Sequence, residues 1–138
     1  MDGNKNFLSN FQVNKITPTI GAEIVGEDLF NNLSSDNLNK IYNCLIENKV
    51  IFFRNQKISP DQQIHFAKSF GEIEPPHPVY PHVDGYPEIV LLENDQDNPP
   101  DTDVWHTDVT FKPNPAFASI LYSKVIPLSG GDTLWSCL

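Results

Sequence analysis

Several kinds of residue and segment are scarce in this 138-residue sequence, and each scarcity excludes a class of protein. No apolar run approaches the roughly 20 residues that a membrane-spanning helix needs. The polar first ten residues lack the apolar core of a secretion signal. The sequence has only 9 Lys and Arg residues but 18 Asp and Glu residues, so the formal net charge is −9. Nucleic acid and membrane surfaces are therefore poor candidates for the main partner, although a small anionic substrate needs only a local basic pocket.

Cysteine is scarce as well, since the sequence holds only Cys44 and Cys137. The two lie far apart and have no metal-binding spacing. Cys44 falls on the apolar side of a predicted helix, which favours a buried thiol. This composition suits a reducing cytosol, so we expect a cytoplasmic protein. Histidine is limited to four residues, and none of them follows His106.

The first half of the chain predicts strands and a helix in alternation. Residues 6–25 indicate a strand, a turn marked by Pro18 and Gly21, and a second strand around residues 22–25. An amphipathic helix should begin at Ser34 or Ser35 and end near Asn48, because apolar residues recur on one helical face. That face comprises Leu38, Ile41, Tyr42, Leu45 and Ile46.

A buried strand and a second helix are predicted next. Residues 50–53 form a continuous apolar run, which is typical of a buried strand. Ser59 is followed by Pro60 and Gln62, the pattern of a capping box with proline at the first helical position. The helix should place Gly71 at its C′ position.

Residues 74–86 form a segment too rich in proline for a helix or a central strand. A rigid loop is the natural interpretation, and such loops often line binding sites. An ordinary surface loop with solvated histidines is the alternative. The segment contains Pro75, Pro76, His77, Pro78, Tyr80, Pro81 and His82.

The second half of the chain predicts strands joined by loops rich in proline and glycine. The expected strands are residues 87–92, 105–111, 116–125 and 133–135. Together with the earlier helices they favour an α+β fold, with a partial double-stranded β-helix (jelly-roll) core and flanking helices. No internal repeat or linker divides the sequence.

The main chemical signal is the pair His106 and Asp108, which lies in a run rich in β-branched and aromatic residues. In a strand, residues i and i+2 project from the same face. One imidazole and one carboxylate on one face would supply two ligands of a 2-His-1-carboxylate Fe(II) site. The H-x-D pattern alone is weak, however, because a strand histidine bonded to a nearby aspartate is commoner.

Several separate motifs in a fixed order resemble the taurine dioxygenase family, whose members are Fe(II)- and 2-oxoglutarate-dependent oxygenases with a double-stranded β-helix core. The resemblance implies that residues 1–138 are the N-terminal part of a single dioxygenase domain. The apolar last residues also suggest a fragment of a longer protein. The matching motifs are residues 20–22, 28–29, 50–53, 70–72, 77–82, 97–101, 105–111 and 130–135.

The resemblance assigns the metal and cosubstrate sites to individual residues. His106 and Asp108 match the first two iron ligands and so form the catalytic centre. Thr133 matches the threonine whose hydroxyl hydrogen-bonds the distal carboxylate of 2-oxoglutarate. The family's third iron ligand is a downstream histidine, and its 2-oxoglutarate-binding arginine also lies downstream. Neither has a counterpart here, so we expect the 138-residue fragment alone to be inactive.

The same resemblance implies a substrate pocket. His77, Tyr80 and Val109 match residues that bind or surround the sulfonate in taurine-oxidising members. Thr102 stands where those members carry asparagine, and its hydroxyl is shorter and offers a single donor. A small sulfonate other than taurine therefore stays open. His77, if protonated, would give the sulfonate a charge-assisted hydrogen bond.

The implied reaction hydroxylates a small sulfonate such as taurine and releases sulfite and an aldehyde, while 2-oxoglutarate and O2 give succinate and CO2. One alternative keeps the enzyme class but changes the substrate to an alkyl sulfate or an aryloxy or carboxylate compound. A truncated, non-catalytic binding relative is a second alternative. A zinc hydrolase that uses His106 and Asp108 is a third. The sequence leaves open whether the protein forms a homo-oligomer.

Overall fold

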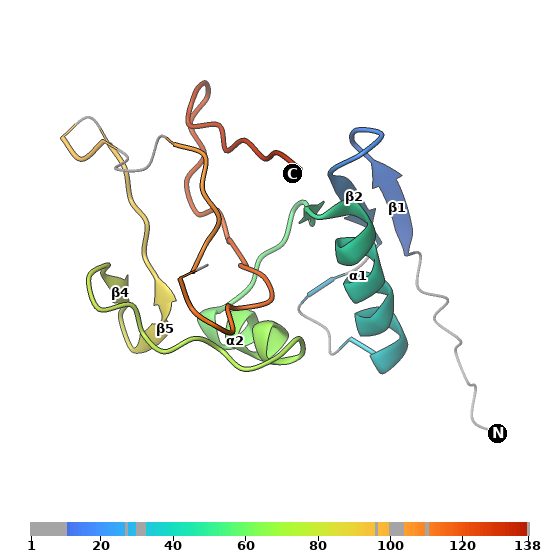
Figure 1. Cartoon of the computed structure of the whole chain (residues 1–138), viewed down its shortest axis with the longest axis horizontal. Coiled ribbons are helices and arrows are strands. Elements are labelled where there is room, and N and C mark those ends of the chain that lie inside the picture. The colour runs from blue at the N-terminus through green and yellow to red at the C-terminus, as the bar shows by residue number, and fades with distance from the viewer. Residues whose placement is uncertain are drawn as a thin grey trace. The chain divides into compact units, whose positions relative to one another are not determined.

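The structure is a computed structural model that describes residues 11–26, 28–29, 33–95, 97–99, 104–109 and 111–137. Its contacts divide the chain into two compact units, drawn in Figure 1. The first unit comprises Met1–Ile58 and Ser123–Leu138, and the second comprises Ser59–Tyr122. That the whole chain belongs to a single dioxygenase domain stays a prediction.

The first unit is built on a small mixed sheet. Its strands are β1 (Gln12–Lys15), β2 (Ala22–Val25) and β3 (Ile51–Phe52), in the order β1-β2-β3. β1 runs antiparallel to β2, whereas β2 and β3 are parallel and are joined through helix α1 (Ser35–Asn48). The predicted strands and helix are therefore confirmed, although β3 is shorter than expected and only half-buried.

The turn between β1 and β2 explains the need for Gly21. The amide of Ile16 donates to the carbonyl of Gly21 at 2.9 Å, and Gly21 has a φ of 87°. This left-handed conformation favours glycine over residues with a Cβ. A Cβ at this position would lie at ordinary contact distance, 3.7 Å, from the side chain of Ile16. The backbone conformation, not lack of space, therefore selects glycine.

Helix α1 begins as predicted, but its buried face differs from the expected one. The hydroxyl of Ser34 accepts a hydrogen bond from the amide of Asn37 at 3.2 Å and caps the helix. The buried positions are Ile41, Cys44 and Asn48, spaced i, i+3 and i+7. The expected face was centred about one residue away from the face that is buried. It therefore included Tyr42 and Ile46, which are 43% and 52% exposed. Ala22 and Ile24 of β2 and Ile58 are also buried in this unit.

Asn48 links the end of α1 to the sheet. Its side-chain amide donates to the carbonyl of Cys44 at 2.9 Å, so its polar group is paired although the residue is only 4% exposed. Its own carbonyl accepts from the amide of Gly21 at 2.9 Å. A buried polar group paired in this way fixes local geometry at small cost.

The second unit contains one helix and a β-hairpin. Helix α2 (Pro60–Lys68) starts with the predicted capping box: the hydroxyl of Ser59 accepts from the amide of Gln62 at 3.2 Å, and the amide of Ser59 donates to the side chain of Gln62 at 2.8 Å. The helix ends at Lys68 with Ser69 as its C-cap, so Phe70 is at C′ and Gly71, which was predicted at C′, lies one residue further on.

The hairpin pairs β4 (His82–Val83) with β5 (Tyr86–Val90) in an antiparallel ladder. β5 confirms the strand predicted near residues 87–92, whereas β4 lies inside the proline-dense segment and was not predicted. The hydroxyl of Tyr86 donates to Asp61 at 3.0 Å and ties β5 to the first turn of α2. Phe66, 8% exposed, stacks edge-on against Phe70 with ring centroids 5.1 Å apart.

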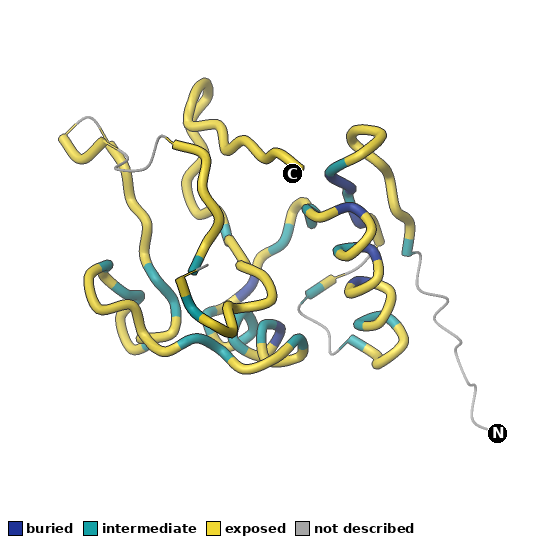
Figure 2. The backbone as a smooth tube through the Cα atoms, viewed as in Figure 1, coloured by how far each residue is buried: buried dark blue, intermediate teal, exposed yellow. Residues whose placement is uncertain are grey.

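The strands predicted at residues 105–111, 116–125 and 133–135 are wrong for this structure, because no described residue after Val90 is in a strand. A strand needs a neighbouring backbone to satisfy its amides and carbonyls. These segments have no such neighbour within the described ranges. Figure 2 shows almost all of them exposed, and Trp105 and Phe111 are 70% and 84% exposed. The described residues form helices and short sheets, as the α+β class predicts, but they do not assemble a jelly roll among themselves, and the jelly-roll core stays a prediction. In the described part of the chain, no helix is long and apolar enough to cross a membrane.

Candidate functional site

His106 and Asp108 come together in the second unit. The Nε2 atom of His106 lies 3.4 Å from the Oδ1 atom of Asp108, and the two side chains are 53% and 62% exposed. The Nδ1 atom of His106 lies 2.9 Å from the carbonyl oxygen of Val104. A carbonyl can only accept, so Nδ1 donates this hydrogen bond, and Nε2 is the ring nitrogen that a metal could bind.

Asp108 is hydrogen-bonded through the carboxylate oxygen that does not lie next to His106. The hydroxyl of Ser119 donates to Oδ2 of Asp108 at 3.0 Å. Each of the two side chains is thus hydrogen-bonded at one atom and presents its other atom, Nε2 of His106 or Oδ1 of Asp108, toward the same point. Such partners behind a ligating atom are the usual support of a protein metal ligand.

The route to this convergence differs from the predicted one. We expected the alternation of a strand to bring His106 and Asp108 to one face, but a turn does so. Asp108 and Val109 lie in that turn, and the amide of Lys112 donates to the carbonyl of Val109 at 3.0 Å. Val109 has a φ of 45°, a conformation that costs a β-branched residue about 1–3 kcal/mol. The side chain of Val109, which was predicted to line the substrate pocket, is half-buried.

An ion pair fastens this turn to the segment before His77. The ammonium of Lys112 pairs with the carboxylate of Glu74, and both side chains are about one-third exposed. The two loops that carry predicted site residues are therefore linked within the second unit. An ion pair at this depth is less screened by water than a fully exposed one.

His77 and Tyr80 form a compact turn. The Nδ1 atom of His77 accepts hydrogen bonds from the backbone amides of Val79 and Tyr80, both at 3.2 Å. The two rings lie 4.7 Å apart with a tilt of 38°. Because two N–H groups point at Nδ1, the ring proton lies on Nε2. In that tautomer, Nε2–H is the donor on the side of the ring away from the two amides.

The two remaining predicted site residues are Thr133 and Thr102. Thr133 is exposed and lies in the first unit, outside any strand. Thr102 falls outside the described residues. The roles assigned to both stay predictions.

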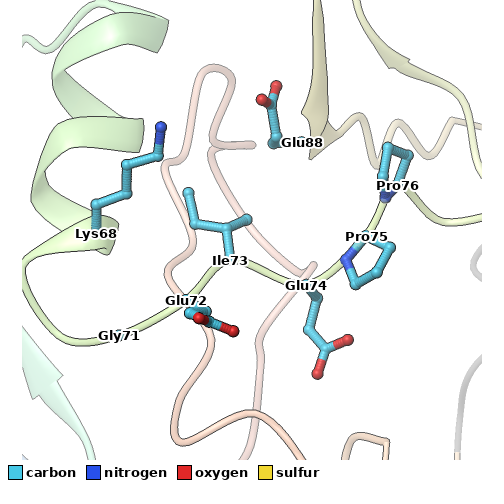
Figure 3. Close-up of a pocket in the computed structure, with 8 residues that line it drawn as sticks. All are labelled: Lys68, Gly71, Glu72, Ile73, Glu74, Pro75, Pro76 and Glu88. Atoms are coloured by element: carbon cyan, nitrogen blue, oxygen red, sulfur yellow. The ribbon is translucent and has the colours of Figure 1, made fainter.

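A hollow of about 480 Å3 lies between the end of α2 and β5, and it includes none of the predicted site residues. Ile73 stands in its middle, and the carboxylates of Glu74 and Glu88 point in opposite directions (Figure 3). The acidic side chains therefore do not converge on a common ligand. The remaining lining residues are Lys68, Gly71, Glu72, Pro75 and Pro76.

The donor set fits a divalent first-row metal, because one imidazole nitrogen and one carboxylate oxygen face the same point. No group of three or more His, Cys, Asp or Glu side chains that could hold a metal occurs among the residues whose positions are described. This part of the chain thus supplies two candidate ligands. Sequence reasoning missed Ser119, because nothing in the sequence connects it to Asp108 across 11 residues.

The chain matches known proteins along nearly its whole length. The family described as taurine catabolism dioxygenase TauD, TfdA family, matches residues 12–136. An alkylsulfatase of Acinetobacter baylyi is 39% identical over 133 residues, which are 96% of this chain and 41% of that protein. An alpha-ketoglutarate-dependent sulfate ester dioxygenase of Pseudomonas putida is 43% identical over 125 residues, which are 90% of this chain and 40% of that protein.

A solved structure agrees with these matches. The crystal structure of a taurine dioxygenase from Burkholderia xenovorans has 38% sequence identity and a TM-score of 0.55, over 60% of this chain and 31% of that one. The chain spans about two fifths of the length of the curated relatives described above. The resemblance inferred from the sequence motifs is confirmed, and the chain belongs to the TauD/TfdA family of alpha-ketoglutarate-dependent dioxygenases.

Proposed function

We propose that the whole protein is an Fe(II)- and 2-oxoglutarate-dependent dioxygenase that oxidises a small organic anion bearing a sulfate ester or a sulfonate group. The observation that carries the proposal is the convergence of His106 Nε2 and Asp108 Oδ1 at 3.4 Å. Each side chain is held at its other polar atom, His106 by the Val104 carbonyl and Asp108 by Ser119. Both near atoms are therefore left to bind a metal.

Fe(II), 2-oxoglutarate and O2 together supply a two-electron oxidation of a C–H bond, while 2-oxoglutarate is converted to succinate and CO2. In this chain His106 and Asp108 would hold the metal. We assign the third protein ligand to residues beyond this chain. The hydroxyl of Thr133 would hydrogen-bond the distal carboxylate of 2-oxoglutarate.

The substrate anion would be bound by neutral donors. His77 presents Nε2–H on the side of its ring opposite to the two backbone amides. Tyr80 stacks beside it and limits the directions in which the imidazole can turn. Thr102 would add a hydroxyl donor, and Val109 an apolar wall next to Asp108. Neutral donors suit the terminal oxygens of a sulfate ester and of a sulfonate equally well.

An alkyl sulfate ester is our first candidate and a sulfonate such as taurine the second. The first is favoured because the alkylsulfatase and the sulfate ester dioxygenase align over at least nine-tenths of this chain. The threonine at position 102 agrees with a substrate other than taurine, since taurine-oxidising members resemble this chain but carry asparagine there. The second is supported by the 38% identity to a taurine dioxygenase.

The released anion distinguishes the two candidates. Hydroxylation of the carbon that bears the sulfate ester gives an intermediate that collapses to an aldehyde and sulfate. Hydroxylation of the carbon next to a sulfonate gives an aldehyde and sulfite. In both cases one O2 and one 2-oxoglutarate are consumed, and one succinate and one CO2 are formed.

The test uses the protein encoded by the full reading frame, supplied with Fe(II), 2-oxoglutarate and either a medium-chain alkyl sulfate or taurine. We expect sulfate from the alkyl sulfate, with one succinate per sulfate. Release of sulfite from taurine alone would select the second candidate. Both candidates would be refuted if an aryloxy acid released phenol while the alkyl sulfate gave no sulfate and taurine gave no sulfite. The variant His106→Ala, which lacks one proposed ligand, is the control and should form no product.

The remaining features of the whole protein are also proposals. The exposed apolar side chains of Trp105, Phe111 and Leu134 are those that a completed β-helix would bury. Burial of such side chains is the main source of stability in a jelly roll. We place the enzyme in the cytoplasm, where Cys44 and Cys137 would stay reduced.

A further inference from the structure

We propose that Ser119 is a positioning residue that holds the carboxylate of Asp108 in the orientation in which one oxygen faces the candidate metal centre. Its hydroxyl donates to Oδ2 at 3.0 Å, whereas Oδ1 lies 3.4 Å from Nε2 of His106. With Oδ2 engaged, Asp108 would bind a metal through Oδ1 alone. The consequence for the metal rests on the proposed function, but the orientation of the carboxylate does not.

Asp108 depends on such a partner because its own backbone does little to restrict it. The residue lies in a turn, and its side chain is 62% exposed. An exposed aspartate samples several staggered χ1 rotamers. Within the described ranges, the hydrogen bond from Ser119 is the one that holds this carboxylate, since the 3.4 Å approach of His106 is long for a hydrogen bond.

Ser119 and the Val104 carbonyl act on the two candidate ligands in the same way. Val104 engages the imidazole atom that faces away from Asp108, and Ser119 engages the carboxylate atom that faces away from His106. Partners of this kind orient metal ligands, and their loss commonly lowers metal affinity about 10- to 100-fold. Ser119 reaches Asp108 across 11 residues of sequence, and both side chains are exposed.

The orientation is testable on this chain without any metal. Three-bond couplings between the backbone and the Asp108 side-chain carbon report the χ1 rotamer populations in isotopically labelled protein. We expect one dominant rotamer in the parent chain, averaged couplings in Ser119→Ala, and restored couplings in Ser119→Thr, which keeps the hydroxyl. Ser123→Ala, at another exposed serine, is the matched control and should leave the couplings unchanged.

Two results would overturn the positioning role. One is averaged couplings in the parent chain, and the other is a single dominant rotamer in Ser119→Ala. Because both partners are exposed, thermal unfolding midpoints of the parent and Ser119→Ala should agree closely. A large drop in the midpoint would mean that Ser119 acts on the fold, and this too would contradict the proposal.

The consequence for metal binding is measured with Mn2+ alone, by the loss of the electron paramagnetic resonance signal of the free ion. The probe is titrated into this chain and its variants. We expect Ser119→Ala to bind about 10- to 100-fold more weakly and Ser119→Thr to recover most of the affinity. Equal affinities in the parent and Ser119→Ala would refute the metal part of the proposal. Binding that survives in His106→Ala would count against the proposed metal site itself, and the rotamer couplings would still decide the role of Ser119.

Discussion

His77 offers a sharp test of the predicted substrate loop, because its two ring nitrogens have different roles. Nδ1 accepts from the amides of Val79 and Tyr80 at 3.2 Å, and Nε2 is left as a donor. His77→Asn keeps an acceptor at the position of Nδ1 and removes the far donor. His77→Gln keeps a far donor and removes the near acceptor. Both substitutions remove the ring that stacks on Tyr80, so this loss cancels when the two variants are compared.

The expected difference follows from the two backbone hydrogen bonds. Each is worth about 0.5–1.5 kcal/mol, and His77 is exposed, so the lower half of that range applies. We therefore expect His77→Gln to have a free energy of unfolding about 1–2 kcal/mol below that of His77→Asn. Urea denaturation would be followed by the fluorescence of Trp105, which lies in the second unit, in a Trp135→Phe background.

The tautomer itself can be read directly. Long-range proton–nitrogen spectra of the imidazole should show Nδ1 of His77 as the unprotonated nitrogen and Nε2 as the protonated one. Equal stabilities of His77→Asn and His77→Gln would contradict the proposed capping of the loop. A protonated Nδ1 in the spectra would refute the neutral-donor assignment, whatever the stabilities were.

The other predictions concern the two units separately. Ser59→Ala should lower the free energy of unfolding of the second unit by about 1 kcal/mol in a urea titration, because the capping box is lost, and equal stabilities of the parent and the variant would contradict this. Asn48→Ala should destabilise the first unit by about 1–3 kcal/mol through the buried bond to Cys44, and an unchanged denaturation midpoint would refute this. Burial raises the pKa of the Cys44 thiol above 9.0, so a disulfide reagent near neutral pH should modify the exposed Cys137 first. The neutral thiol's contribution to stability is complete below about pH 9 and is lost as the pH rises through the raised pKa, a loss that Cys44→Ala should not show.

The features that could be predicted from the sequence are those set by local contacts. Ser34 and Ser59 cap their helices through bonds to residues three positions away, so the pattern alone identified Ser59 and narrowed the first N-cap to Ser34 or Ser35. Gly21 marked a turn because its backbone conformation excludes most other residues. The prediction of the buried face of α1 was less accurate, since Asn48 is polar and gave no hydrophobic signal. Its burial depends on pairing with Cys44.

The features that were missed depend on parts of the chain that are distant in sequence. β propensity indicated a strand at residues 105–111, but propensity supplies no partner for the backbone hydrogen bonds. Val109 adopts a left-handed φ that its β-branched side chain disfavours, so its sequence argued against the turn that is present. His106 and Asp108 meet as expected, although through that turn and not through a strand. Ser119 and the Lys112–Glu74 pair had no local signal.

The central claim is that His106 and Asp108 hold Fe(II) in a 2-oxoglutarate-dependent dioxygenase. The most direct test is an anaerobic titration of the protein from the full reading frame with Fe(II) and 2-oxoglutarate, followed by visible absorption. We predict a metal-to-ligand charge-transfer band that is absent in His106→Ala and in Asp108→Ala. Absence of the band in the parent protein, or its persistence in both variants, would contradict the claim.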